Sequence, residues 1–168
     1  MKQKAVMLSI NPKWCALIAS GAKTVEVRRN APKLEAPFRC YIYCTSIPKN
    51  NQSDYVFVNA FTGGNIDAWT GHVIAEFICH KVEKFERGEA FETLARKSCV
   101  EIEELYGYAY TQPHLFGWNI SELKMYDTPK QINSFNKWIE GSTEEYAVER
   151  PPQGWAYVEE AQAHGATD

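Results

Sequence analysis

Residues 5–29 read AVMLSINPKWCALIASGAKTVEVRR and carry the strongest local signals of the chain. Residues 5–10 are apolar enough for a short buried strand. Asn11 followed by Pro12 is typical of a helix start, because Asn caps the first turn and Pro at the first helical position has no amide hydrogen to leave unpaired. Gly21 can adopt the left-handed conformation that closes a last helical turn. The stretch therefore predicts a strand, a helix ending near Gly21 and a second strand over residues 24–28.

The second strand alternates polar and apolar residues. Val25 and Val27 are expected to face a core, while Glu26 and Arg28 share the opposite face with Cα atoms roughly 7 Å apart. An arginine fork suits a phosphate or a base edge, a lysine such as Lys23 offers a mobile point charge, and a glutamate accepts a hydrogen bond from an exocyclic amine. The alternative interpretation is a surface strand with an ion pair worth less than about 1 kcal/mol.

The rest of the chain mixes strand and helix patterns. Periodicity predicts helix over residues 89–106, in two pieces that meet near Cys99, with Ser98 and Glu101 as a capping box. A loop is expected at 46–53 and a turn at 62–65, and residues 129–138 fit no single pattern. The predicted later strands cover residues 38–45, 55–60, 71–85, 118–126 and 155–159. The sum is an α+β domain built on a small bent sheet or barrel of about six strands, flanked by two or three helices.

Length and composition favour one ordinary globular unit. The chain has 168 residues, 45% hydrophobic and 23% charged, so we expect a single domain over residues 1–160 and a disordered tail at 161–168. No run reaches about 18 apolar residues, and the start is too short and charged for a signal peptide, which predicts a cytoplasmic protein without a membrane partner. The five cysteines are expected to be reduced and mostly buried.

Charge is unevenly distributed along the chain. The net charge is −3, but residues 1–33 hold seven Lys or Arg residues and the single acid Glu26, and so carry +6 against −9 for the remainder. A locally positive field attracts anionic ligands even on a mildly acidic protein. The alternative is that these lysines only keep the surface hydrated.

Several familiar catalytic sites are absent from the sequence. It contains no phosphate-binding loop, dinucleotide fingerprint, zinc-protease helix or nucleophile elbow. Cys40 and Cys44 lie roughly 13 Å apart on one predicted strand and cannot share a tetrahedral zinc ion. Cys79 and His80 would point to opposite faces of a strand, so Cys79 is expected in the core. We therefore expect neither a metal nor a cofactor.

Other side chains are weaker candidates. Trp14 is predicted to lie in the core and Trp69, beside a glycine-rich loop, to be exposed as a stacking platform for unpaired bases. Glu76 is either an acid facing a cleft or an ordinary salt-bridged strand residue. His72 and His114 are read as structural residues, with ligand binding or proton transfer as the alternative.

The order Asn11-Pro12-Lys13-Trp14, then Gly21-x-Lys23-x-x-Glu26-x-Arg28, resembles the ASCH domain (activating signal cointegrator homology), a branch of the PUA-like superfamily. The segments Gly71–Phe77, Phe116–Trp118 and Arg150–Val158 are similar to those of bacterial and phage-type ASCH proteins. The resemblance covers nearly the whole chain.

This resemblance implies a PUA-like β-barrel flanked by helices, with a cleft beside the first helix, in a family generally regarded as RNA-binding or nucleic-acid-associated. Carried over by position, the motif side chains would line that cleft, and neighbouring cations would extend it. The leading hypothesis is a binding module rather than an enzyme, which holds RNA or a nucleotide-like ligand in a basic cleft. The proposed ligand-binding residues are Lys13, Lys23, Glu26, Arg28 and Arg29.

Two alternatives belong to other classes. Some ASCH members are small amidohydrolases that deacetylate acetylcytidine with a Lys and a Thr nucleophile, and others are described as ribonucleases. Lys23 matches that lysine, but the position of the nucleophile holds Glu26, and Thr24 falls two residues early. A hydrolase acting on a modified nucleoside would then use Lys23 as electrostatic stabiliser and Glu26 as general base for water. A protein-binding adaptor would instead use the acidic stretch 140–149.

Overall fold

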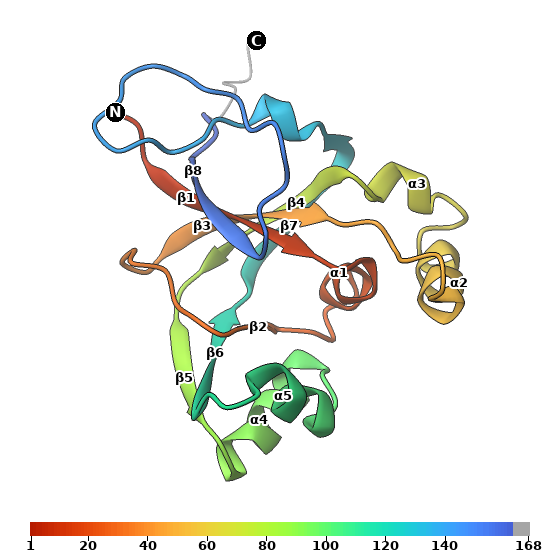
Figure 1. Cartoon of the computed structure of the whole chain (residues 1–168). Coiled ribbons are helices and arrows are strands. Elements are labelled where there is room, and N and C mark those ends of the chain that lie inside the picture. Colours follow the sequence, from red (N-terminus) through yellow and green to blue (C-terminus); the bar gives the residue numbers. More distant parts are fainter. Residues whose placement is uncertain (163–168) are drawn as a thin grey trace.

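The computed structural model describes residues 1–162 as two β-sheets with helices around them (Figure 1). The strands are β1 (Lys4–Ile10), β2 (Val25–Arg28), β3 (Phe38–Cys44), β4 (His72–Cys79), β5 (Val82–Glu86), β6 (His114–Asn119), β7 (Ser121–Lys130) and β8 (Trp155–Glu159). The helices are α1 (Pro12–Ala19), α2 (Gln52–Phe61), α3 (Ile66–Trp69), α4 (Glu89–Ser98) and α5 (Ile102–Ala109), with a 3₁₀ turn, η1, at Ile132–Ser134.

The strands form a five-stranded sheet in the order β7-β4-β3-β1-β8 and a three-stranded sheet in the order β2-β6-β5. Within residues 1–162 these sheets do not close, so the α+β class is confirmed but the predicted barrel is wrong. Strand β8 pairs with β1 and, through a bridge at Val158, with Lys137 of the loop after η1, while β2 pairs with β6. Within residues 1–162 the edge strands β8 and β2 are therefore not paired with each other. Strands β1 and β3 run parallel because α1 and β2 intervene between them, and all other pairs are antiparallel.

The strand–helix–strand start of the chain is confirmed. The Asn11 side-chain oxygen accepts from the Lys13 amide at 3.1 Å, and Pro12 occupies the first helical turn. Gly21 follows the last turn of α1 with φ 85°, a conformation that glycine adopts without a steric penalty. Strand β2 is one residue shorter than predicted.

Two strand predictions fail for local reasons. Residues 55–60 belong to helix α2, because the Asn51 side chain caps it by accepting from the Asp54 amide at 3.2 Å and Val58 packs against α1. These interactions outweigh the β preference of Tyr, Val and Phe, which depends strongly on context. The predicted strand 71–85 breaks at His80–Lys81, so its two halves, β4 and β5, enter different sheets. The predicted strand 118–126 likewise divides into β6 and β7.

The helical pair α4 and α5 meets at Cys99, as predicted. Cys99 has φ 61° and ends α4. The predicted capping box is wrong, because Glu101 stands at the start of α5 without a side-chain cap, while Ser98 Oγ accepts from the Val100 amide at 3.4 Å.

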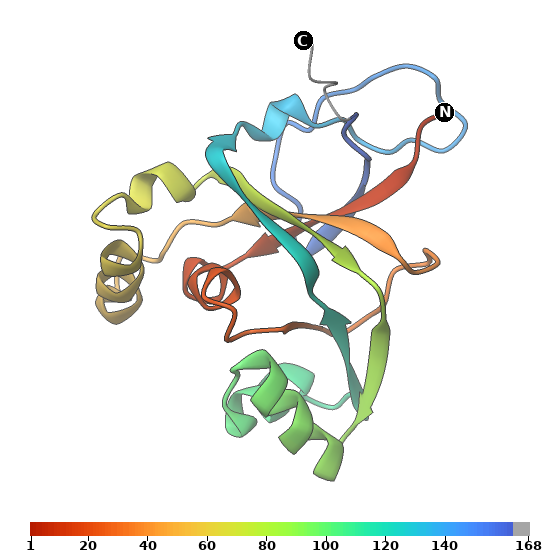
Figure 2. The ribbon, with the colours of Figure 1, turned by 180° about the vertical axis from the view of Figure 1, so that it is seen from behind.

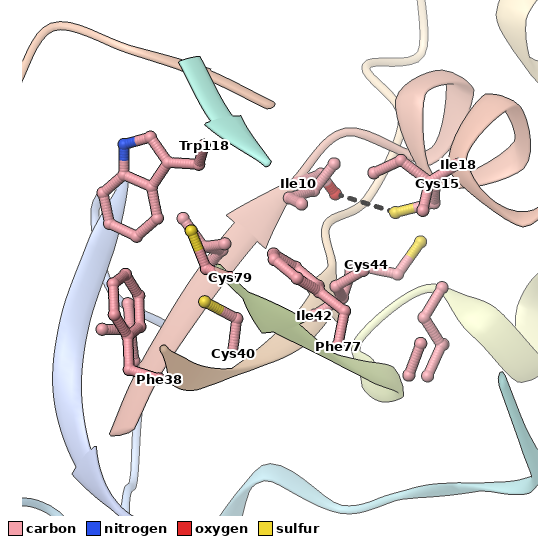
Figure 3. Packing of buried hydrophobic residues seen from close by; sticks show 14 residues of the cluster. Ile10, Cys15, Ile18, Phe38, Cys40, Ile42, Cys44, Phe77, Cys79 and Trp118 are labelled. Carbon is pink, nitrogen blue, oxygen red and sulfur yellow. Dashed lines mark hydrogen bonds between the residues drawn. The ribbon is translucent and has the colours of Figure 1, made fainter. Parts of the chain in front are cut away.

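The small sheet is covered on both faces. On one face, Val25 and Val27 pack with Phe85 and Leu115 against α4 and α5. On the opposite face, Trp118 joins the main core between the two sheets, and Figure 3 shows this core with its buried cysteines. Figure 2 shows α1 alongside the strands, with α2 and α3 beyond it and α4 and α5 against the small sheet. A polar side chain on the inner face of β2 is therefore buried.

The cysteines behave as predicted in the described part of the chain. All five are free, and four of them are buried, namely Cys15, Cys40, Cys44 and Cys79. The tail predicted at 161–168 lies outside the described residues from 163 onward, while the Ala161 amide donates to the Tyr41 hydroxyl at 2.8 Å. The single domain over residues 1–160 stays a prediction. None of the helices in residues 1–162 has the length and apolar character needed to span a bilayer.

Candidate functional site

Lys23, Glu26 and Arg28 come together where α1, β2 and the helical pair α4–α5 meet. Lys23 lies in the loop after α1, and Glu26 and Arg28 project from the inner face of β2, opposite Trp118 and Phe116 of β6. Lys23 is 2% exposed and Glu26 4% exposed. The interpretation of β2 as a surface strand is therefore wrong, since charged side chains are almost never buried so completely without partners.

The Lys23 ammonium is held by groups from two helices. Nζ donates to the Ser98 carbonyl at the end of α4 at 2.7 Å and lies 4.8 Å from the centre of the Trp14 ring on α1. Burial lowers the pKa of Lys23, and the nearby Glu26 carboxylate opposes that shift. Lys23 therefore acts from inside the protein, as a fixed positive charge beside Glu26, and not as a flexible surface cation.

Glu26 is only half satisfied. Its Oε1 accepts from the Val27 amide at 3.1 Å and lies 3.9 Å from a terminal nitrogen of Arg28. Its Oε2 is buried and has no hydrogen-bond partner within residues 1–162. A carboxylate oxygen in this position is an acceptor without a donor.

Arg28 has a buried donor without an acceptor, where Glu26 has a buried acceptor without a donor, within residues 1–162. One terminal nitrogen donates to the Ser9 carbonyl at 3.0 Å, while its buried Nε has no acceptor within the described chain. Ser9 is in turn tied to the segment before β8, since its Oγ donates to the Pro152 carbonyl at 2.7 Å and its amide to the Gly154 carbonyl at 2.8 Å. Arg28 is thus fixed between β1 and that segment.

Within residues 1–162 the arrangement leaves one buried acceptor, Glu26 Oε2, and one buried donor, Arg28 Nε, without partners on the same face of β2. Leaving a buried polar atom without a partner costs about 1–3 kcal/mol, and more for a charged group. A ligand that offers an N–H to Glu26 Oε2 and an oxygen to Arg28 Nε would remove both costs.

Lys13 and Arg29 are not part of this cluster. Lys13 lies on the surface of α1 with its ammonium 4.7 Å from the centre of the Trp14 ring. Arg29 is exposed and turns to the other side of the small sheet, where its Nε donates to the Tyr108 carbonyl at 2.8 Å. The five predicted ligand residues thus divide into an inner trio, one cation on α1 and one cation at the end of β2 that contacts α5.

Two of the three remaining cations of the basic segment, Lys2 and Lys4, contact acidic residues. Lys2 bonds Glu159 at 2.7 Å and the Glu144 carbonyl at 3.1 Å, and Lys4 contacts Glu140 at 3.3 Å. Lys4 and Ser9 are five residues apart on β1, roughly 17 Å. The charge that the sequence places together is therefore divided in space, and the acidic stretch 140–149 is partly neutralised.

Weaker candidates find structural roles. Glu76 pairs with Arg39, so its salt-bridged interpretation holds. Trp69 is only half-buried, against α1 and α2, and Trp14 is also half-buried, so neither prediction about these rings is fully correct. Burial raises the pKa of Cys79 to about 11, and its thiol donates to the Lys81 carbonyl, as expected of a core cysteine.

The histidines are tied into ordinary contacts. His80 is exposed beside Glu122 at 2.7 Å, pointing away from the buried Cys79. His72 Nδ1 lies 3.0 Å from the Thr70 carbonyl oxygen, and the His114 ring packs edge-on against Phe116.

Two hollows of the surface are lined by other residues. One, of about 180 Å³, lies between Lys4, Arg39 and Glu160, and an open groove of about 580 Å³ lies between α4 and α5 beside Cys99. That the trio lines an open cleft stays a prediction. Among residues 1–162, no three His, Cys, Asp or Glu side chains are placed to hold a metal ion.

Sequence reasoning missed the groups that fix the trio. The Ser98 and Ser9 carbonyls are backbone atoms, which every residue possesses, so no residue type marks them. Trp118 covers Glu26 only because β2 pairs with β6, a pairing of segments far apart in the chain. The alternation of polar and apolar residues in β2 correctly predicted that Glu26 and Arg28 share one face of the strand.

Comparison with known proteins agrees with this fold. The sequence model of the ASCH domain family matches residues 8–142. Crystal structures of the ASCH protein from Zymomonas mobilis share the fold: the unmodified protein has a TM-score of 0.60 at 17% identity, over 91% of this chain and 86% of that one. A serine-to-alanine mutant of that protein has a TM-score of 0.63 at 16% identity, over 91% of this chain and 87% of that one. A tyrosine-to-phenylalanine mutant has a TM-score of 0.60 at 17% identity, over 92% of this chain and 90% of that one.

No curated protein matches the chain. The family match extends over most of the sequence and includes all the residues of the inner trio, with the strands that hold them. The fold is shared with the Zymomonas mobilis protein over most of the length of both chains. This chain therefore belongs to the ASCH domain family.

Proposed function

We propose that the protein binds RNA or a nucleotide-like ligand at the trio Lys23, Glu26 and Arg28. The observation that carries the proposal is the pair of buried, unpartnered atoms, Glu26 Oε2 and Arg28 Nε, within residues 1–162. Two such atoms on one strand face, beside a buried lysine, are costly in a protein that has no ligand for them.

A nucleobase edge suits the two atoms. Glutamate accepts from an exocyclic amine, and an arginine N–H donates to a ring nitrogen, a keto oxygen or a phosphate oxygen. Lys23 supports the site from behind, because its Nζ is engaged with the Ser98 carbonyl and faces no solvent. Membership of the ASCH family, which suggests nucleic-acid binding in general, supports the same class of ligand.

Binding of a fluorescent single-stranded RNA, followed by anisotropy, tests the proposal. Glu26→Gln and Arg28→Lys keep the shape of the site but remove the charge or the fork, and each is expected to weaken binding about tenfold or more. Lys33→Ala, which removes a cation from the exposed loop after β2, is the matched control and should change affinity less than twofold. Unchanged binding by both site variants would refute the proposal.

The salt dependence of this affinity is expected to be shallow. Only Arg28 of the trio is more than marginally exposed, and Lys13 is the nearest surface cation on α1. One or two phosphate contacts correspond to a log–log slope of about 0.7 to 1.4 on single strands. A slope near zero, or one above about 4, contradicts binding at this site, because it would require either no phosphate contact or many.

The same geometry supports a second candidate, a hydrolase acting on an acylated nucleoside. The supporting observation is the free Oε2 of Glu26 beside a lysine whose pKa is lowered by burial, an arrangement common at catalytic sites. Glu26 would take a proton from water as the water oxygen attacks the acyl carbon, releasing the acid and the free amine. Turnover of acylated nucleosides that disappears in Glu26→Gln supports this candidate, and turnover unchanged in that variant removes it.

A further inference from the structure

A second surface, outside the trio, gathers aromatic rings and arginines at the end of α5. The sequence here is Tyr106-Gly107-Tyr108-Ala109-Tyr110. Arg29, from the end of β2, and Arg87, from the loop after β5, both reach this end of the helix. We call these five side chains, Tyr106, Tyr108, Tyr110, Arg29 and Arg87, the tyrosine–arginine surface.

Each arginine lies on a tyrosine ring. The Arg29 guanidinium is 4.1 Å from the centre of the Tyr108 ring, and that of Arg87 is 5.3 Å from the centre of the Tyr106 ring. The terminal nitrogens of Arg29 make no hydrogen bond within residues 1–162, so its charge remains open to an anion. A guanidinium stacked on a ring presents a flat cationic surface of the kind on which bases stack.

Tyr110 is held in a strained backbone conformation with its ring in solvent. Its backbone has φ 54° and ψ −110°, a combination that tyrosine rarely adopts. The residue is 79% exposed. Arg87 fixes this conformation by donating to the Tyr110 carbonyl and to the Gln112 carbonyl, the latter at 2.8 Å. Strained residues of this sort persist where the surroundings enforce them and occur preferentially at functional sites.

Helix capping explains only part of this arrangement. Cations near the last carbonyls of a helix are favourable, so both arginines have a structural reason to be here. Capping does not require a large exposed ring at Tyr110, since any residue supplies the same carbonyl. The acids Glu103 and Glu104 lie in the first turn of α5, at the opposite end of the helix from the two arginines.

The position of β2 connects this surface with the trio. Strand β2 is the edge of the small sheet, and Arg28 and Arg29 are successive residues, so their side chains leave that edge on opposite faces. Arg28 belongs to the trio and Arg29 to the tyrosine–arginine surface. Two successive residues at one sheet edge thus link the trio with the tyrosine–arginine surface.

We infer that the tyrosine–arginine surface stacks unpaired bases of a single-stranded RNA whose neighbouring nucleotide occupies the trio. The inference rests on the proposed function for the trio and adds a second contact region with its own residues. Stacking on tyrosine is tolerant of sequence, so this surface adds affinity for longer strands and little base preference.

Strand length separates the two regions experimentally. Anisotropy and competition measurements compare a mononucleotide, which fits the trio alone, with a 12-nucleotide single-stranded RNA, which reaches both regions. Tyr110→Ala is expected to weaken the 12-nucleotide RNA about tenfold and to leave the mononucleotide within twofold, whereas Tyr110→Phe, which keeps the ring, retains wild-type affinity for both. Tyr146→Ala, which removes an exposed tyrosine of the acidic loop, is the matched control and should have no effect.

A photochemical readout distinguishes contact from a purely structural effect. A 12-nucleotide RNA carrying 5-bromouridine, irradiated in the complex and digested, should crosslink to the peptide that contains Tyr108 and Tyr110. Equal affinity of the wild type and Tyr110→Ala for the 12-nucleotide RNA, or crosslinks confined to other peptides, overturns the inference.

The outcomes also separate the inference from the proposed function. If Glu26→Gln and Arg28→Lys lose both ligands while Tyr110→Ala loses neither, only the inference falls. If Tyr110→Ala weakens the long RNA while the trio variants bind normally, the proposed function falls, and with it the placement of the neighbouring nucleotide in the trio, while base stacking at the tyrosine–arginine surface stands. If the wild type binds neither ligand at low salt, both fall.

Discussion

Lys23 shows how the sequence can predict the charged neighbour of a residue without predicting that the residue is buried. The motif spacing put it beside Glu26, and the structure agrees. What the sequence could not show is that Lys23 is 2% exposed and bonded to a helix carbonyl, because burial depends on which distant segments cover a residue. The residue types of the site were predictable, and their accessibility was not.

Burial of Lys23 gives the stability of the protein a defined pH dependence. Its pKa is lowered in the folded state, while in the unfolded chain it returns to about 10.4. Between these values the unfolded chain binds more protons, so the free energy of unfolding increases with pH. The cost of burying the charge is fully present below the folded pKa and disappears above the unfolded one.

We therefore expect the wild type to gain stability relative to Lys23→Met as the pH rises from about 7 towards 10. Urea unfolding of both proteins at several pH values measures the difference, in which the titration of tyrosines and cysteines common to both proteins largely cancels. A difference that stays constant, or that moves in favour of the variant, contradicts a lowered pKa for Lys23.

Among the elements, β6 depends on a glycine at its centre. A Cβ atom at Gly117 would lie 2.7 Å from a ring carbon of Phe85 and 2.8 Å from a methyl carbon of Val25. Both neighbours belong to the core between the small sheet and the helices α4 and α5, so neither can move freely. The small sheet thus packs closely because this position has no side chain.

Gly117→Ala is expected to destabilise the protein by about 1–3 kcal/mol through overpacking. That corresponds to a decrease of about 2–12 °C in the melting temperature for a chain of this size. Gly107→Ala is the control: this glycine lies within α5, and a Cβ atom added there would meet nothing within 4 Å, so the change should stabilise by about 0.5–1 kcal/mol. Calorimetry measures the melting temperatures of both variants. A melting temperature of Gly117→Ala equal to that of the wild type would show that Phe85 and Val25 move to make room for the methyl group.

Element types were predictable where the local signals agreed. The cap at Asn11, the break at Cys99 and the alternation of β2 each combined residue type with spacing, and the structure contains all three. Helix α2 was mistaken for a strand because its residues favour strands, while its Asn51 cap was read as part of a loop. Helix or strand was decided there by one side-chain hydrogen bond and by packing on α1.

At the scale of the whole molecule, the sheet closure and the charge field were the least predictable features. Both depend on contacts between segments far apart in the sequence. The barrel expected from the family resemblance is open, because the edge strands β2 and β8 of the two sheets do not pair with each other within residues 1–162. The positive field expected from residues 1–33 is reduced, because Lys2 and Lys4 lie against acids near the other end of the chain.

This division of charge predicts that Lys4 contributes to stability and not to RNA affinity. Its ammonium lies 5.2 Å from the centre of the Trp138 ring and 4.8 Å from that of Tyr157, and so it anchors the loop after β7. Lys4→Ala should lower the melting temperature and leave RNA binding within twofold, whereas Arg28→Lys removes most of the binding. A parallel loss of affinity in Lys4→Ala would mean that the basic segment acts as one long-range field.

The bond from Lys23 to the Ser98 carbonyl has an evolutionary consequence. This ammonium fastens the last turn of α4 to the loop after α1, and under the proposed function the same group would support ligand binding. A substitution of Lys23 would therefore alter two properties at once, ligand recognition and the contact between α4 and the loop after α1. Divergence in what such a protein recognises is thus easier to reach through the tyrosines of α5, whose rings can vary while that joint stays intact.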